Sequence, residues 1–177
     1  MSERITNNYN PTPDDIREWG YDEDLYFMEQ DEDLLLYGLG YVPVLLELAQ
    51  DPACPKQDYA LWILGQFARE SALYRRSEQL EGLQKVVVLL QTSQPSVQDW
   101  RNYVDRLLAY QAPPFAVNEQ KAWIMAQDLL VGIGRVGQIN RVTEQPSDVW
   151  CFSLITSIHE QLSITKRTGV YTYQRLV

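Results

Sequence analysis

Residues 38–70 read GLGYVPVLLELAQDPACPKQDYALWILGQFARE, and this stretch predicts two helices joined by a short loop. Apolar residues recur at helical spacing from Val42 to Ala49. Asp51-Pro52 ends this first helix, because a residue that precedes proline is disfavoured in the α conformation. Neither helix can bury its apolar side alone, so we expect the two to pack together and against a neighbour. The second helix starts at about Lys56, and its expected buried residues are Tyr59, Ala60, Ile63, Leu64 and Phe67.

Two motifs within this stretch are typical of a helical repeat. Gly40 to Leu48 matches G-x-V-P-x-L-L-E-L, and Ala60 to Gly65 reads A-L-W-I-L-G. Together they resemble one armadillo or HEAT repeat, whose first helix opens with Gly and a Val-Pro or Ile-Pro pair. The second helix of such a repeat carries an A-L-W-x-L core. The match covers 33 of the 177 residues, from Gly38 to Glu70.

A weaker second copy spans Gly82 to Tyr110, without the Val-Pro start or the Ala-Leu-Trp core. Aligning residues 57–59 with residues 98–100 gives an offset of 41 residues, which lies within the range of these repeats. The resemblance implies an all-α fold built as a short right-handed stack of antiparallel helix pairs. We expect residues 1–11 to be a loose N-terminal segment and residues 12–177 to form a single helical domain.

Capping and helix-ending residues predict further helices on either side of the central pair. Thr12 begins a short helix, and residues 22–37 form the next. A helix over residues 73–91 is expected to break near residues 75–77, and Ser96 is expected to cap the one that follows.

After residue 110 the pattern changes at Ala112-Pro113-Pro114, the clearest linker in the chain. Asn118 is expected to cap another helix, and Pro146 to begin the last long one. The tail, residues 164–177, is rich in β-branched and aromatic residues, which favours an extended segment or a hairpin there. The expected core residues of the helix after Asn118 are Trp123, Ile124, Ala126, Leu130 and Ile133.

Composition indicates one globular domain with a strongly uneven charge. The hydrophobic fraction is 45%, no apolar run is long enough to span a membrane, and the N-terminus has no signal-peptide pattern. Cys54 and Cys151 stand 97 positions apart, which favours free thiols in the cytoplasm. The net charge is −9, and the first 58 residues hold 14 acidic and only 3 basic residues.

This acidic N-terminal third predicts a partner of opposite charge. A field of this sign repels nucleic acids and anionic lipid, so we expect neither direct nucleic-acid binding nor membrane binding, and it attracts basic proteins. Tyrosines interleaved with carboxylates supply contact area beside the charge. The alternative is an ordinary solvated face. The candidate partner-binding residues are Tyr21, Asp22, Glu23, Asp24, Tyr26, Glu29, Asp31, Glu32 and Asp33.

The patterns that carry catalysis in other proteins are weak here. Gly132 to Gly137 reads G-x-G-x-x-G, but a dinucleotide site needs a strand before it, and a helical pattern precedes it. His159 is the only histidine and has no nucleophile at a typical spacing, and the acidic runs lack the spacing of a calcium loop. We therefore expect no catalytic residue, no cofactor and no metal.

The hypothesis from sequence is a non-catalytic protein-binding module that engages a basic protein, for example an inhibitor or immunity protein against a toxin. A structural or assembly adaptor that acts through self-association or subunit stacking is the alternative. The oligomeric state stays open.

Overall fold

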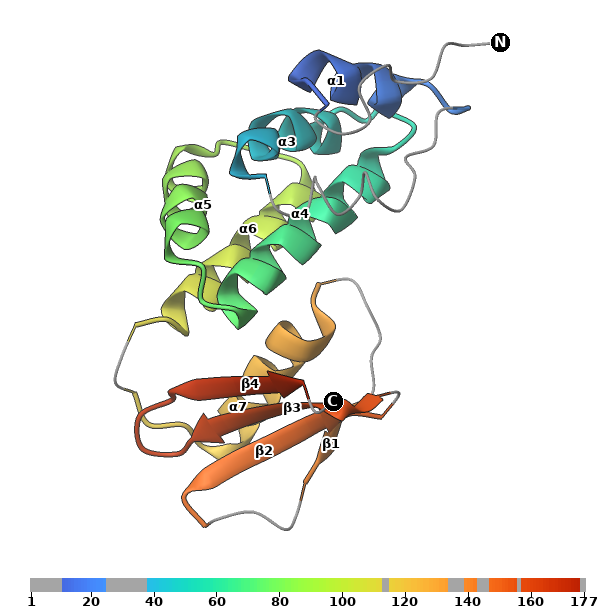
Figure 1. Cartoon of the computed structure of the whole chain (residues 1–177). Helices are drawn as coiled ribbons and strands as arrows, with labels where there is room; N and C mark the ends of the chain where they lie inside the picture. Colours follow the sequence, from blue (N-terminus) through green and yellow to red (C-terminus); the bar gives the residue numbers. More distant parts are fainter. Residues whose placement is uncertain are drawn as a thin grey trace.

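The chain folds into a helical part followed by a helix-backed sheet, as the computed structural model in Figure 1 shows. It describes residues 11–24, 38–112, 115–133, 139–142, 147–155 and 157–175. The helical part contains α1 (Pro13–Tyr21), the 3-10 turn η1 (Leu39–Tyr41), α3 (Val42–Gln50), α4 (Gln57–Leu73), α5 (Ser77–Leu89) and α6 (Pro95–Ala109).

The central helix pair is confirmed. α3 and α4 pack against each other, α4 packs on α6, and α5 packs on α6. Large side chains, among them Phe67 and Trp100, are fully buried between these helices. The expected break after α4 is also present, because Arg75 adopts a left-handed backbone with φ of 51° before α5 begins at Ser77. Whether the pair is a true armadillo or HEAT repeat stays a prediction.

The expected all-α fold is wrong, because the C-terminal part contains a four-stranded antiparallel sheet in the order β1-β2-β3-β4. The strands are β1 (Ile139–Arg141), β2 (Val149–Leu154), β3 (Ser157–Thr165) and β4 (Tyr171–Arg175). Ahead of them stand α7 (Glu119–Ala126) and the π-helical turn η2 (Gln127–Val131). α7 covers one face of the sheet, where the rings of Trp123 and Phe152 lie 4.9 Å apart.

The helix expected from Pro146 is therefore β2 and part of β3. Val149, Phe152 and Ile155 stand three positions apart, which fits one side of a helix. The run of residues 149–155 is apolar at almost every position, however, so it is compatible with a strand as well. The structure has the two-residue period of a strand: Phe152 in β2 and Leu162 in β3 face each other, and both are buried. The expected extended tail is confirmed in part, since β4 lies within it and pairs with β3.

Two smaller expectations are also corrected. Gln94 precedes the first residue of α6, so Ser96 does not cap that helix. Trp123 and Ile124 are exposed rather than in the core, since α7 buries the neighbouring positions Ala122 and Met125 instead.

The helix expected over residues 22–37 and the loose segment expected at residues 1–11 lie mostly outside the described residues. The expected helix over 22–37 begins with Asp22, whose backbone is extended, and its residues 25–37 are not described. The expected loose segment includes residues 1–10, which also lie outside the described residues.

A buried carboxylate joins the helical part to the sheet part. Asp128 in η2 accepts two hydrogen bonds from the Arg106 guanidinium, each 2.9 Å long, and one of 2.7 Å from the Tyr110 hydroxyl. The Tyr103 hydroxyl donates to the backbone carbonyl of Asp128 at 2.8 Å. On the strand side, the Tyr171 hydroxyl donates to the carbonyl of Ala72 at 2.5 Å. These contacts hold β4 beside the ends of α4 and α6 (Figure 1).

Candidate functional site

The candidate site is the acidic end of the helical part, which begins at α1. Thr12 caps this helix: the Asp15 amide donates to the Thr12 hydroxyl at 3.2 Å, and the Thr12 amide donates to the Asp15 carboxylate at 2.7 Å. This exchange lowers the pKa of Asp15. Ile16 and Trp19 anchor the inner side of α1 in the core. The opposite side of the helix therefore presents its acidic residues to solvent.

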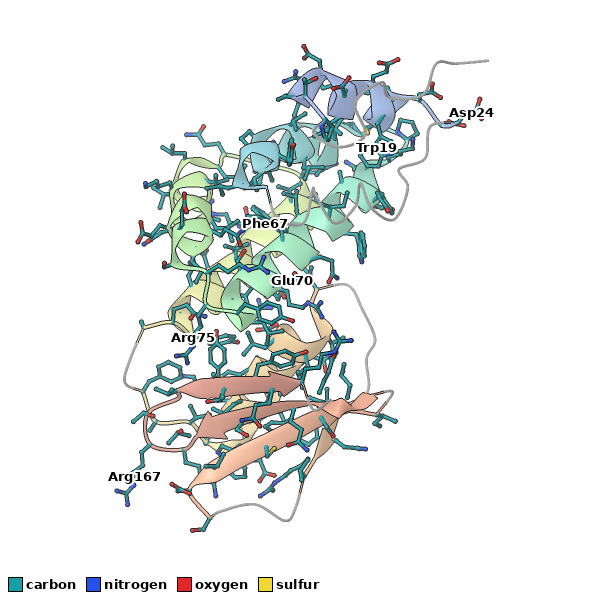
Figure 2. The ribbon with its side chains drawn as sticks, viewed as in Figure 1. Trp19, Asp24, Phe67, Glu70, Arg75 and Arg167 are labelled. Carbon is teal, nitrogen blue, oxygen red and sulfur yellow. The ribbon has the colours of Figure 1, made fainter. Side chains whose placement is uncertain are left out.

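Those acidic residues gather at the C-terminal end of α1, where a surface hollow is lined by Glu18, Tyr21, Asp22 and Glu23 together with Arg17. Glu18, Tyr21 and Glu23 are exposed. Asp24 projects at the outer tip of the molecule (Figure 2). The structure thus brings together four of the predicted partner-binding residues at one end of the fold.

The two basic residues of this region are turned toward the protein itself. Arg17 pairs with Asp14 at 2.6 Å and with Glu47 of α3 at 2.9 Å, which lowers the pKa of Glu47. Lys56 donates to the carbonyl of Trp19 at 2.8 Å and to that of Asp22, and burial lowers its pKa. Residues 11–24 and 38–58 contain nine acidic and two basic residues, so the described surface of this end is strongly negative.

One tyrosine of the site is held in place by a carboxylate. The Tyr21 hydroxyl donates to Asp51, which follows α3. This hydrogen bond raises the pKa of Tyr21 to about 12 and lowers the pKa of Asp51. Because Tyr21 is exposed and its hydroxyl is already bonded, the free part of the ring can pack against the side chain of a partner.

Five of the predicted residues, Tyr26, Glu29, Asp31, Glu32 and Asp33, lie outside the described residues. The structure adds Glu18, Glu47 and Asp51 to the acidic end. Glu18 could have been predicted from the sequence as well, because it is an acidic residue of the same N-terminal third, next to Arg17. Glu47 and Asp51 join only because α1 packs on α3, a contact between segments about thirty positions apart.

The groups considered for catalysis lie in the C-terminal half of the chain, at the glycine motif after η2 and in β3. Gly132 follows η2 as its C-cap, with φ of 89°, so a helical turn and not a strand precedes the glycine motif, whose residues 134–137 lie outside the described part. His159 belongs to β3 rather than to a helix. Among the described residues no group of acidic, His or Cys side chains is arranged to hold a metal ion.

Both cysteines are buried free thiols. The Cys54 thiol donates to the carbonyl of Gly20 at 3.2 Å, and burial raises its pKa. A raised pKa keeps the thiol protonated near neutral pH, which makes it a poor nucleophile.

Comparison with known protein families, with curated proteins and with solved structures finds no match. Over the described ranges, no helix is both long enough and apolar enough to cross a bilayer.

Proposed function

We propose that this chain is a non-catalytic protein-binding module whose acidic N-terminal end engages a basic partner. The observation that supports it is the surface of that end, where nine acidic residues stand against two basic ones that are already bonded within the chain. Carboxylates that are not neutralised within the chain steer a positively charged protein toward the site and accelerate encounter. Exposed Tyr21 adds contact area beside them.

A concrete version is an inhibitor or immunity protein that covers a cationic toxin. A toxin that acts on nucleic acid carries a positively charged active-site groove, and a surface rich in carboxylates competes for it. The same negative surface disfavours direct contact with nucleic acid and anionic membranes.

The test uses partners captured from the source cell and compares two triple variants. The site variant carries Asp22→Asn, Glu23→Gln and Asp24→Asn. The control removes the same charge from another surface by Glu78→Gln and Glu81→Gln on α5 and Asp99→Asn on α6. The association rate of a captured basic protein is measured by stopped flow at low and high salt.

We expect the site variant to slow association by roughly tenfold at low salt and to approach wild type at high salt, because salt screens steering. The control is expected to change the rate much less, because its charges lie elsewhere. Equal association rates for wild type and the site variant at low salt would show that the acidic end does not take part in binding. Folding is checked for both variants by circular dichroism.

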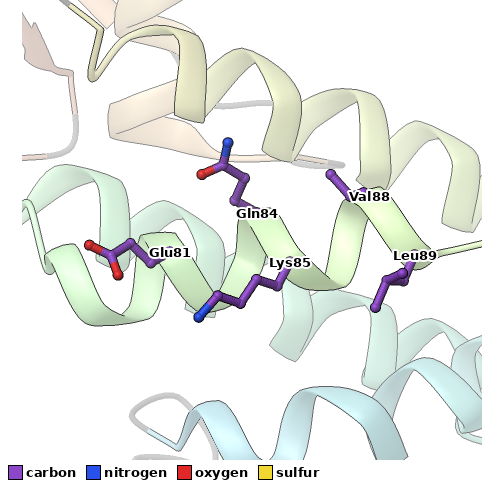
Figure 3. A pocket seen from close by; sticks show the side chains of 5 residues that line it. All are labelled: Glu81, Gln84, Lys85, Val88 and Leu89. Carbon is purple, nitrogen blue, oxygen red and sulfur yellow. The ribbon is translucent and has the colours of Figure 1, made fainter.

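A specific observation supports the adaptor as a second candidate. Val88 and Leu89, at the end of α5, are 72% and 79% exposed and line a surface hollow with Glu81, Gln84 and Lys85 (Figure 3). Neighbouring exposed aliphatic side chains suit stacking against another subunit. If the chain acts this way, Val88→Ser with Leu89→Ser should convert an oligomer into a monomer in sedimentation velocity. A wild-type monomer at high concentration would rule this candidate out.

A further inference from the structure

A second surface, at the junction of the two parts, has the opposite chemistry to the acidic end. Residues 73–75, at and just beyond the end of α4, face Tyr171, Thr172, Tyr173 and Arg175 of β4 across a hollow of about 540 Å³. Figure 2 shows Arg75 at this junction, between the helices and the sheet. The acidic end, marked by Asp24, lies at the far end of the molecule in the same view.

The hollow carries positive charge in a chain whose net charge is −9. Arg75 and Arg175 are both exposed, and neither forms an ion pair within the described ranges. Glu160 stands opposite Arg175 across the strand pair, but it lies close to Tyr173, whose pKa is raised by burial and then by that negative charge. Two guanidinium groups therefore remain available to an anionic ligand.

Aromatic rings shape the hollow and hold one of these arginines. The Arg75 guanidinium lies 4.7 Å from the centre of the Tyr171 ring and donates to the Tyr171 carbonyl at 2.7 Å. The rings of Tyr74 and Tyr173 meet edge to face at 5.6 Å. Because Arg75 uses one N–H here, its other donors can still bind a carboxylate.

The outer edge of β4 lines the hollow, and at Tyr171 it is already occupied by the hydrogen bond from Arg75. β4 pairs only with β3 among the described strands. The Thr165 amide donates to the Val170 carbonyl beside the turn, so hydrogen-bonding positions alternate along β4 from there. Tyr171, Tyr173 and Arg175 therefore turn their backbone groups away from β3, and the bond from Arg75 to the Tyr171 carbonyl agrees with that direction.

We propose that this junction binds an acidic, extended peptide segment of a partner protein, which adds to the sheet along the open edge of β4. The outward backbone groups of Tyr173 and Arg175 pair with the peptide backbone, as in other cases of strand addition. Carboxylates on alternate peptide residues reach Arg75 and Arg175, since side chains alternate along a strand. The open row of backbone donors and acceptors favours a peptide over a nucleic acid, which has no matching backbone pattern.

This inference goes beyond the proposed function, because it concerns a different surface and a partner of the opposite charge. The two can fail separately: variants of the acidic end do not alter this junction, and variants of Arg175 do not alter the acidic end.

The test measures binding of a fluorescent hexapeptide in which Glu and Thr alternate, by fluorescence polarisation with the full chain. A second hexapeptide has the same composition but places all Glu residues first, so its carboxylates fall on both faces of a strand. A third keeps the alternating sequence but carries N-methyl groups on alternate amides, which blocks strand pairing. We expect the alternating peptide to bind best and the methylated one to lose about tenfold in affinity.

Arg175→Gln tests the charge, with Arg167→Gln as its matched control. Arg167 is exposed on the turn between β3 and β4, outside the hollow (Figure 2). We expect Arg175→Gln to weaken binding roughly two- to fivefold at low salt, the range for one exposed ion pair, and Arg167→Gln to leave it unchanged. Slower amide exchange at Tyr173 and Arg175 on binding would support pairing along β4.

Three results would overturn the proposal. The first is equal binding of the methylated and unmethylated peptides, which would leave only charge attraction. The second is an equal loss of peptide affinity in Arg175→Gln and Arg167→Gln. The third is tighter binding of a short oligothymidylate than of the alternating peptide, with that binding lost in Arg175→Gln, which would make the junction a nucleic-acid site.

Discussion

Replacing Asp128 by Asn tests whether one buried carboxylate joins the helical part to the sheet part. The side chain is 10% exposed and receives three hydrogen bonds, two from Arg106 and one from Tyr110. Asn keeps the shape but removes the charge. It also places an amide N–H₂ where the structure supplies only donors, so at least one donor loses its acceptor.

The burial of the two partners sets the expected magnitude. Breaking a fully buried ion pair costs about 3–5 kcal/mol, because the remaining charge is left without a partner. Arg106 is 46% exposed, so water compensates part of that loss. We expect Asp128→Asn to lower the free energy of unfolding by about 2–3 kcal/mol. For a chain of this size the loss corresponds to a melting temperature lower by roughly 4–12 °C.

The surface pair of Arg17 and Glu47 is a matched control. Its shortest N–O distance is also 2.9 Å, but its side chains are 42% and 49% exposed. Glu47→Gln makes the same change from carboxylate to amide and is expected to cost less than about 1 kcal/mol, because water screens an exposed pair. Any difference between the two variants therefore reflects the burial of Asp128 and its additional hydrogen bond from Tyr110, rather than the distance within the ion pair.

The assay is equilibrium unfolding in urea, followed by circular dichroism and by tryptophan fluorescence. Equal losses of stability for Asp128→Asn and Glu47→Gln would refute the reasoning. The double variant Arg106→Met with Asp128→Asn gives a further check: if the two groups form one pair, its loss should be smaller than the sum of the single losses.

Three further predictions concern other elements. Burial raises the pKa of Tyr103 and Tyr110 above the ordinary value near 10, so these hydroxyls hold their protons more tightly in the folded chain than in the unfolded one. Their contribution to the free energy of unfolding should therefore be complete below about pH 10 and decrease at higher pH. Alkaline titration followed by circular dichroism and by tyrosinate absorbance measures this loss. Gly169→Ala should destabilise the sheet by about 1–3 kcal/mol, because the φ of Gly169 is +65° and the new Cβ would lie 2.5 Å from a ring carbon of Phe115. Gly40→Ala is the control: its Cβ would meet nothing within 4 Å, so the melting temperature should be close to that of wild type. Thr12→Ala should cost about 1 kcal/mol in urea unfolding, since it removes the side-chain cap of α1, and an unchanged midpoint would show that this helix is held by packing alone.

The central helices could be predicted because their local signals agree with one another. Periodic apolar residues, the Asp51-Pro52 stop and the caps at Thr12 and Asn118 all act over a few residues, and the structure has each of them in place. The break near Arg75 was visible in the same way, as a polar interruption between two apolar patterns.

The sheet was harder to predict, because a short run such as Val149 to Ile155 satisfies both helical and strand periods. What decides between them is the neighbour across the strand: Leu162 faces the buried Phe152, and Ile164 faces the partly buried Trp150, only when β3 pairs with β2. That pairing is a long-range contact, and no local pattern encodes it.

In the candidate site, too, some features follow from the local sequence and others depend on contacts between distant segments. The sequence by itself determined the sign of the charge, the caps at Thr12 and Asn118, and the acidic-end residues 21–24, because these depend on composition and short-range spacing. Only the tertiary structure decided that Glu47 and Asp51 join that end, that Arg17 and Lys56 bond to groups within the chain, and that Arg75 meets the edge of β4. These facts depend on which distant segments pack together, and packing is settled by the burial of apolar surface over the whole chain.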